Sequence, residues 1–542
     1  MLVKAGLPFP APSDVDSGAF GGREAIPTEA AWSVAVIECQ PYALRMGFKE
    51  DADFARFVSM GAVGAAAVAF GLSDEHGHRM VELERYAMAN KVWQTKVKRL
   101  RLPDLLCVRC GLRVEARAKS KLGIVLSHSD APGREWDAGG MRDGDLFAFI
   151  RTDLSRFPPY AGAPVCFSKA ALRASIHQAR RSVPKAASEG SESTLTWPCW
   201  VPSRPGRFLE VDAEGRICYQ DDLGAQRRYW QWRNWTAPRH VYLEPGDKFD
   251  AGGTIVAGVV QPAGSRACAG DTWHLSGDLC SSDPVDRYAA VRAVGMSGRR
   301  DLVDRLVAIE ADTAEDWRTR LEARANLARL DAASWAPAIA DGAIDDDAET
   351  ERRMEAVFAL TELRDGAAAH ELARIADSLS LPPEVRAAAA WGLGQGGSRR
   401  ADLLVSLGLD SDETVALHAL AAIEELPHSV RDTLTHWLAS EDARRAETAA
   451  CLLARHRCID NLLDACEGSG QARLLALRAL GDLPREAVRL HAEERLTPEF
   501  TAILEPMWYG QDTWLRTTGQ EGLDALDVQK VRFDPAAPRD LG

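Results

Sequence analysis

The segment "PDLLCVRCGLRVEARAK", residues 103–119, decides how the first half of the chain folds. It opens with a short apolar run, and residues 112–119 then alternate between apolar and charged side chains. Such alternation is typical of a β-strand that buries one face. The residues "RCG" between the two runs can supply a turn. The segment therefore predicts a β-hairpin whose second strand carries Glu115, Arg117 and Lys119 on one face.

Further elements of an α/β domain flank this hairpin. Residues 79–99 predict a preceding helix, because apolar side chains recur there at helical spacing. The runs at 121–129 and 145–152 predict strands, and residues 168–181 predict another helix. We expect these elements to form one α/β domain with a mixed sheet over residues 1–182.

The remainder of the chain divides into four parts. Residues 183–195 are polar and rich in helix breakers, which predicts a linker. Residues 196–285 contain many Trp, Gly and Pro residues and short strand signals, which predict a small β-rich domain. Alanine-rich helical segments recur about every thirty residues over 286–490, which predicts a stacked all-α solenoid. We expect residues 491–542 to form a C-terminal cap or tail.

The solenoid segments resemble HEAT repeats, with small residues where helices would pack closely. The resemblance implies a binding scaffold for a protein, for nucleic acid or for a neighbouring domain, and the fold alone does not decide among these. The sequence contains no Walker A loop, HExxH or GxSxG motif, so ATPase, zincin and α/β-hydrolase functions are unsupported. The chain has no signal-peptide pattern or membrane-spanning run, and we expect a cytoplasmic protein without a membrane partner.

Charge is distributed unevenly along the chain. The formal net charge is -14, yet residues 1–290 carry 36 Lys and Arg against 34 Asp and Glu. Within this part, residues 85–122 hold eleven basic residues and two acids. A concentration of this kind is typical of a phosphate-contact surface, although a solvated helix face has the same composition. We expect a nucleic acid, which we interpret as DNA, to contact Lys96, Lys98, Arg99, Arg101, Arg113 and Lys121.

Two acids of the hairpin are candidates for catalysis. Asp104 opens the first strand, and it can approach Glu115 across the hairpin. Two carboxylates and a nearby cation are what metal-assisted phosphodiester hydrolysis needs, because the carboxylates hold Mg²⁺ and the cation stabilises developing charge.

This arrangement resembles the PD-(D/E)xK nuclease superfamily, in which the PD and (D/E)xK motifs lie on adjacent strands of a small mixed sheet. The resemblance implies a restriction-endonuclease-like domain that cuts DNA with Mg²⁺, in a bacterial restriction or anti-phage system. Asp104 and Glu115 would be the metal ligands, and Glu82 or Glu84 an additional acid. The sequence departs from the pattern at Glu-Ala-Arg, because Arg117 stands in the lysine position and Lys119 follows two residues later. Three alternatives stay open: Lys119 takes the catalytic role of the lysine, Arg117 fills it imperfectly, or the domain has kept the fold and lost the reaction.

The same hairpin suggests a zinc knuckle. Cys107 and Cys110 form a CxxC pair before a glycine, and a tetrahedral zinc site needs two further ligands. The candidates for these are His76, His78, Cys166, Cys199 and Cys218. The alternative is two small thiols packed in a strand.

Three functions stay open from the sequence. The first is the Mg²⁺-dependent DNA endonuclease with a regulatory or partner-binding solenoid. The second is a non-enzymatic scaffold, in which a zinc-knuckle domain binds nucleic acid or protein. The third is a lyase-like or maturation factor whose helical repeats hold a cofactor-bearing partner, which leaves the basic segment unexplained.

Overall fold

A computed structural model describes most of the chain between residues 48 and 507. Within this part, no helix is long and apolar enough to cross a membrane. The described residues are 48–86, 93–95, 97, 100–131, 134–137, 139–154, 159–187, 190–264, 267–395, 400–483, 485–492, 495, 498 and 501–507.

The first domain is built around a mixed sheet. Strand β2 runs antiparallel to β1 and β3, β3 runs parallel to β5, and β6 and β7 pair antiparallel with β5. The structure thus confirms the predicted hairpin and the mixed sheet. The elements are α1 (Phe48–His76), β1 (Met80–Glu82), β2 (Leu105–Cys107), β3 (Arg113–Lys119), β5 (Leu146–Asp153), β6 (Tyr160–Ala161) and β7 (Val165–Ser168).

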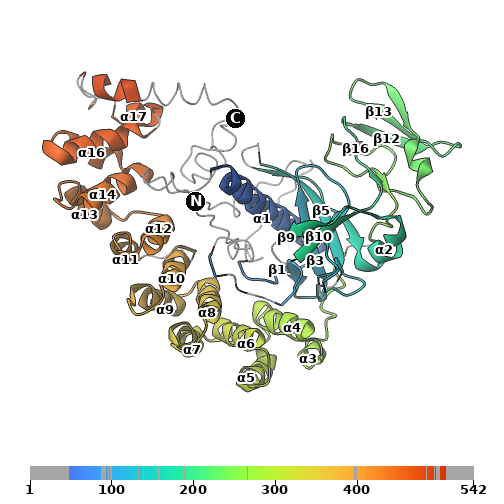
Figure 1. The fold of residues 1–542 in the computed structure, drawn as a ribbon, viewed down its shortest axis with the longest axis horizontal. Helices are drawn as coiled ribbons and strands as arrows, with labels where there is room; N and C mark the ends of the chain where they lie inside the picture. The colour runs from blue at the N-terminus through green and yellow to red at the C-terminus, as the bar shows by residue number, and fades with distance from the viewer. Residues whose placement is uncertain are drawn as a thin grey trace.

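Helix α1 covers one face of this sheet (Figure 1). The fit is close at Gly64, where a Cβ atom would overlap with the Cβ of Ala118 on β3. Val68 and Leu72 of α1 are buried there against the alternate residues of the strands. Because side chains alternate along β3, Glu115 and its charged neighbours point to the other face.

The prediction of a helix at 79–99 is wrong for the described residues of this segment. Residues 80–82 form strand β1, residues 83–86 form a turn, and part of the remaining segment lies outside the described residues. Met80 is paired with Cys107, so cross-strand pairing and burial override the helical pattern of the sequence. The helix that precedes the hairpin is α1, in a region for which the sequence predicted no helix.

The opposite face of the sheet is covered by a second, smaller sheet. Strand β10 pairs with β4, β8 and β9, and Phe147, Phe149 and Trp197 share the core between the layers. The expected linker at 183–195 is therefore part of a folded sheet, because most of β9 and β10 lies within it. The elements are β4 (Val125–His128), α2 (Lys169–Ala174), β8 (Arg180–Arg181), β9 (Lys185–Ala187) and β10 (Gly190–Thr196).

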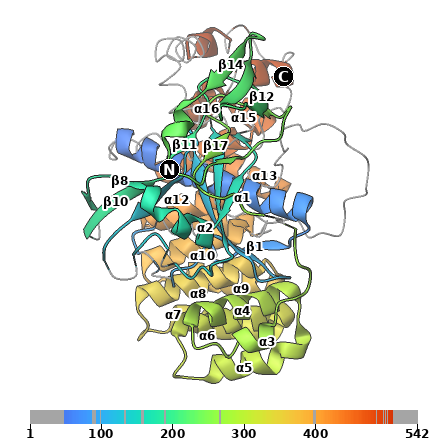
Figure 2. The ribbon, with the colours of Figure 1, turned by 90° about the vertical axis from the view of Figure 1, so that its right-hand side faces the viewer.

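The small β-rich part forms two sheets. The aromatic residues are mostly its core: the Trp200 ring stacks on Tyr229 at 4.2 Å, and Trp232 is buried. Figure 2 shows these strands at the opposite end of the molecule from the first solenoid helices. The strands are β11 (Cys199–Trp200), β12 (Gly206–Val211), β13 (Ile217–Asp221), β14 (Gln226–Tyr229), β15 (His240–Val241), β16 (Lys248–Phe249) and β17 (Ala257–Gly258).

The second half of the chain is the predicted helical solenoid, and its helices follow one another along an arc (Figure 1). Aspartates cap many helices, as Asp412 does by accepting from the Thr414 and Val415 amides. The helices are α3 (Leu275–Asp278), α4 (Pro284–Ser297), α5 (Val303–Ala311), α6 (Trp317–Leu330), α7 (Ala332–Ile344), α8 (Thr350–Leu363), α9 (Gly366–Asp377), α10 (Pro383–Gln395), α11 (Ala401–Leu407), α12 (Glu413–Ala422), α13 (His428–Trp437), α14 (Ala443–Arg455), α15 (Ile459–Cys466), α16 (Gly470–Gly481) and α17 (Arg485–Ala492).

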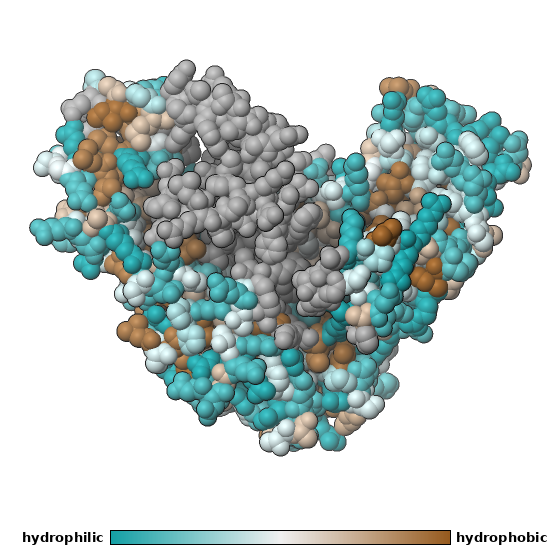
Figure 3. Space-filling model, viewed as in Figure 1, coloured by the Kyte–Doolittle hydropathy of each residue, from teal (hydrophilic) through white to brown (hydrophobic). Residues whose placement is uncertain are grey.

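The solenoid and the sheet domain share a core. Tyr86 and Trp93, which precede the hairpin, pack edge-on against Trp391 of α10 with ring centroids 5.1 and 6.2 Å away. All three side chains are buried in the cluster that holds the solenoid together. The coloured residues in Figure 3 are mostly hydrophilic, with scattered apolar groups. Beyond residue 490, helical residues 501–507 are described, and most of the expected tail is not.

Candidate functional site

Asp104 and Glu115 lie side by side where β2 and β3 begin to pair. Leu105 is opposite Val114 in the register of the two strands, and continuing this register by one residue places Asp104 opposite Glu115. Opposite residues of an antiparallel pair project from the same face. The Asp104 carboxylate also accepts a hydrogen bond of 2.8 Å from the amide of Ala116. The structure therefore brings together the two acids that the sequence singled out.

The environment of Glu115 disfavours its ionised form. Burial, and then the charge of Asp104, raise the pKa of Glu115 to about 8, and Glu84 acts in the same direction. Arg117 opposes this shift, since its guanidinium lies 2.8 Å from Glu115 Oε1. Arg117 thus does not bring the pKa of Glu115 back to its ordinary value, and a second positive charge nearby would stabilise the ionised form of this carboxyl.

A polar cavity opens beside this group. Its volume is about 450 Å³. His128 lies in its wall, where the ring Nδ1 accepts from the amide of Trp136 at 3.4 Å and Nε2 lies 3.3 Å from Asp130. The charged and titratable residues of the lining combine acids with cations: Glu84, Arg101, Glu115, Arg117, His128, Arg134, Glu135, Asp137 and Glu192.

Lys119 lies two residues beyond Arg117 on the same strand face. It is opposite Arg151 of the parallel strand β5 and is half-buried. Burial, followed by the charge of Arg117, lowers the pKa of Lys119. The lysine thus lies beside the charged group, although it is not part of the cavity lining.

The basic segment 85–122 does not form one exposed surface. Arg101 and Lys121 are exposed, and Arg101 reaches the cavity. Arg113 is 1% exposed and donates to Asp286 of α4 at 2.5 Å, so a phosphate contact is not retained for this residue. The predicted contacts Lys96, Lys98 and Arg99 lie outside the described residues.

Arg85, the first residue of that segment, is buried in the solenoid. Its guanidinium donates to Glu322 of α6 and to Glu355 and Glu362 of α8. Arg292 of α4 joins the same network through Glu322 and Glu362. Such buried charges must be paired, so the network fixes the sheet domain against the inner helices of the solenoid.

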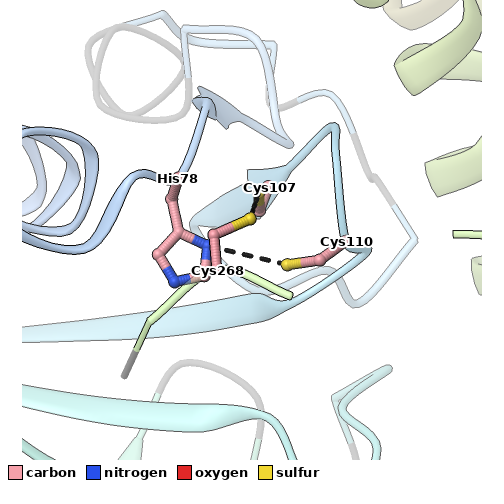
Figure 4. Close-up of side chains that lie close together, drawn as sticks. All are labelled: His78, Cys107, Cys110 and Cys268. Atoms are coloured by element: carbon pink, nitrogen blue, oxygen red, sulfur yellow. Dashed lines mark hydrogen bonds between the residues drawn. The ribbon is translucent and has the colours of Figure 1, made fainter. Parts of the chain in front are cut away.

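A second group of side chains gathers at the tip of the hairpin. His78, Cys107, Cys110 and Cys268 point toward one another (Figure 4). Their ligand atoms all lie within 4.8 Å of one another, and they are the one set of three or more His, Cys, Asp or Glu residues with this property in the described part of the chain. A hydrogen bond from Cys110 lowers the pKa of the Cys107 thiol, which favours its thiolate.

Sequence reasoning anticipated three of these four side chains. Cys107, Cys110 and His78 were candidates, whereas Cys268 was missed because it lies in an irregular segment far along the chain. Of the other candidates, Cys166, Cys199 and Cys218 occupy separate strands, and His76 contributes its backbone oxygen to the Cys268 amide at 2.8 Å. The fourth member, Cys268, could be identified only from the three-dimensional arrangement.

The comparisons with known proteins found similar solved structures, and each of those named below matches less than half of the chain. No family model matches it, and no curated protein does. Similar solved structures include the complex of CpcE and CpcF of phycocyanin lyase from Nostoc (19% identity, TM-score 0.21, 43% of this chain and 93% of that chain). A second is human deoxyhypusine hydroxylase in complex with glycerol, with 18% identity and a TM-score of 0.20 over 44% of this chain and 98% of that chain. A third is YibA from E. coli, with 15% identity and a TM-score of 0.25 over 47% of this chain and 91% of that chain.

Proposed function

We propose that this chain hydrolyses phosphodiester bonds of DNA with a divalent metal ion at Asp104 and Glu115. The observation that supports this most is the placement of the two carboxylates opposite each other on adjacent strands. A polar cavity lined by arginines lies next to them, and it offers room for a nucleotide unit. The predicted role in a restriction or anti-phage system stays a prediction.

The residues present fit a magnesium ion. Carboxylate oxygens are the ligands that Mg²⁺ prefers, and one or two carboxylates suffice because the ion keeps several waters. Asp104 and Glu115 would hold it, and the charge of the ion would offset the burial and the Asp104 charge that raise the pKa of Glu115. When bound, the ion supplies polarisation of the phosphate and a more acidic water.

The arginines would bind and orient the substrate. Arg117 donates to Glu115, yet its buried Nε has no hydrogen-bond partner among the described residues. A guanidinium donates to phosphate oxygens in a fixed geometry, so Arg117 would position the scissile phosphate. Arg101 and Arg134, which line the same cavity, would hold neighbouring phosphates.

Lys119 takes the proton-handling role that Arg117 cannot perform. A guanidinium stays protonated in proteins and does not act as a base. Burial and the charge of Arg117 lower the pKa of Lys119, and this increases the fraction of neutral amine that can accept a proton from water. The displacement of the lysine by two residues keeps it on the strand face that carries Glu115.

A second candidate is a scaffold that binds nucleic acid or protein without cutting. The Arg117–Glu115 ion pair favours it, because this pair satisfies one oxygen of the carboxylate that would bind the metal. In either case the solenoid would bind a protein partner. The excess of acids over bases beyond residue 290, 45 against 29, favours a partner with a basic surface.

A cleavage assay tests the hydrolase. Plasmid DNA, single-stranded DNA and RNA would each be incubated with the protein and Mg²⁺, beside Asp104→Asn and Glu115→Gln variants. We expect cleavage of DNA by the wild type and at least roughly a hundredfold slower cleavage by either variant. Glu244→Gln, at an exposed position of the small β-rich part, serves as the control. Salt-dependent binding without cleavage would support the scaffold instead.

A further inference from the structure

We propose that His78, Cys107, Cys110 and Cys268 bind one zinc ion, and that this ion fastens the start of the solenoid to the hairpin that carries the acid pair. The four side chains come from three separate segments of the chain. His78 follows α1, the two cysteines flank the hairpin turn, and Cys268 lies between the small β-rich part and α3.

The distances fit a tetrahedral zinc site. Cys107 Sγ lies 3.9 Å from Cys268 Sγ, and Cys110 Sγ lies 3.6 Å from His78 Nδ1. Zinc–sulfur bonds of about 2.3 Å and zinc–nitrogen bonds of about 2.0 Å give edges of about 3.8 Å between two sulfurs and about 3.5 Å between sulfur and nitrogen. The cysteines are free thiols, and 3.9 Å is far longer than the roughly 2.05 Å of a disulfide bond.

The donor set identifies the metal and its role. Three thiolates and one imidazole favour zinc over magnesium or calcium, which prefer oxygen ligands. Four protein ligands also complete the usual coordination number of zinc and leave no position for a substrate or water. The ion is therefore structural, and its role is separate from the acid pair.

The backbone around the cluster holds the ligands in position. Gly111 has a φ of 76°, and its amide donates to the Cys107 oxygen at 2.9 Å to close the turn between the two cysteines. This left-handed conformation favours glycine. On the other side, the Cys268 amide is fixed by the backbone of His76. Backbone hydrogen bonds thus fix the turns on which the ligands lie.

The segment after Cys268 lies against the same turn and leads directly into the solenoid. The ring of Trp273 packs on Gly111, where an added Cβ would come within 2.9 Å of it. Arg109 donates to Asp271 at 3.1 Å, although both side chains are largely exposed and this pair contributes little alone. A zinc–thiolate bond at Cys268 would supply the strong link that these contacts lack.

Metal content and chelator resistance test the proposal. The full-length protein, expressed with zinc in the medium, should contain about one zinc ion per chain by elemental analysis. The Cys268→Ser variant should lose its zinc to a chromogenic chelator at a concentration that leaves the wild type loaded. Cys280→Ser, at an exposed cysteine outside the cluster, should match the wild type.

A second measurement covers the case in which Cys268→Ser does not fold. Wild-type protein loaded with Co²⁺ should give the visible spectrum of a tetrahedral site with strong thiolate-to-cobalt charge-transfer absorption. Wild-type protein without zinc, an octahedral cobalt spectrum, or a folded Cys268→Ser variant that holds zinc as firmly as the wild type would each overturn the proposal. Unchanged DNA cleavage after the loss of zinc would agree with the proposal, because the zinc site is separate from the acid pair and does not rest on the proposed hydrolase.

Discussion

Asp104, immediately before β2, lies opposite Glu115 of β3, and their carboxylates share one face of the mixed sheet. The two residues reach this position because a tight turn between Cys107 and Leu112 sets the register of the hairpin. A shift of one residue would send one of the two side chains to the face covered by α1. The pairing of the strands therefore determines whether the acids can act on one ion.

Magnesium should stabilise the wild-type protein through these two acids. At a concentration about 100 times its Kd, a ligand that binds only the folded state adds about 2.7 kcal/mol to the free energy of unfolding. We expect this increase in urea unfolding of the wild type and of Glu244→Gln. Asp104→Asn and Glu115→Gln should show little of it. An equal increase in all four proteins would place the ion elsewhere.

Magnesium affinity should rise with pH. The folded pKa of Glu115, about 8, lies above its ordinary value, so the folded state holds a proton that the unfolded state releases between these values. Without metal, this group's contribution to stability falls as the pH rises through about 8. Mg²⁺ needs the ionised carboxylate, so calorimetric titrations at pH 6.5, 7.5 and 9 should show tighter binding at each step. Affinity independent of pH would contradict a ligand role for Glu115.

Removal of Arg85 should loosen the solenoid from the sheet domain. Arg85→Met leaves the carboxylates of Glu322 and Glu355 buried without this partner, and losing one side of a buried charge pair costs about 3–5 kcal/mol. We expect a lower urea midpoint and faster proteolysis between the two parts. The matched variant Arg79→Met, at an exposed arginine, should change stability by no more than about 0.5 kcal/mol.

Two glycines of α1 should respond in opposite directions to alanine. Gly64→Ala places a methyl group against Ala118 and should destabilise the protein by about 1–3 kcal/mol. Gly71 has nothing within 4 Å of an added Cβ, and Gly71→Ala should be stabilising by up to about 1 kcal/mol because alanine favours the helix. Thermal unfolding of both variants measures the difference. A similar effect of both would argue against close packing of α1 on β3.

The sequence predicted the parts of the fold that depend on local pattern. Strict alternation over 112–119 predicted strand β3, and the recurrence of alanine-rich segments predicted the solenoid. The predicted helix at 79–99 was wrong where β1 forms, because the pairing of Met80 with Cys107 depends on a strand that lies later in the chain. Local periodicity does not contain that information.

For the candidate site, too, the sequence predicted what depends on local pattern and missed what depends on distant segments of the chain. The sequence could predict that Asp104 and Glu115 lie close together, because the register of a hairpin follows from its short turn. Arg113 was predicted to contact phosphate, and Arg85 was counted in the basic segment. A count of charges cannot tell whether an arginine faces solvent or pairs with the carboxylates of a distant helix. The sequence could not predict that Cys268 joins the cluster, because a segment far along the chain must first dock on the hairpin to bring it near the other three side chains.

Crystals soaked in Mn²⁺ would test the central claim most directly, because anomalous scattering locates this substitute for Mg²⁺. We predict one Mn²⁺ peak between the carboxylates of Asp104 and Glu115 in the wild type, and its loss in a folded Glu115→Gln variant. The absence of a peak at these two residues in the wild type, or a peak that persists in Glu115→Gln, would contradict the assignment of the acid pair as a divalent-metal site.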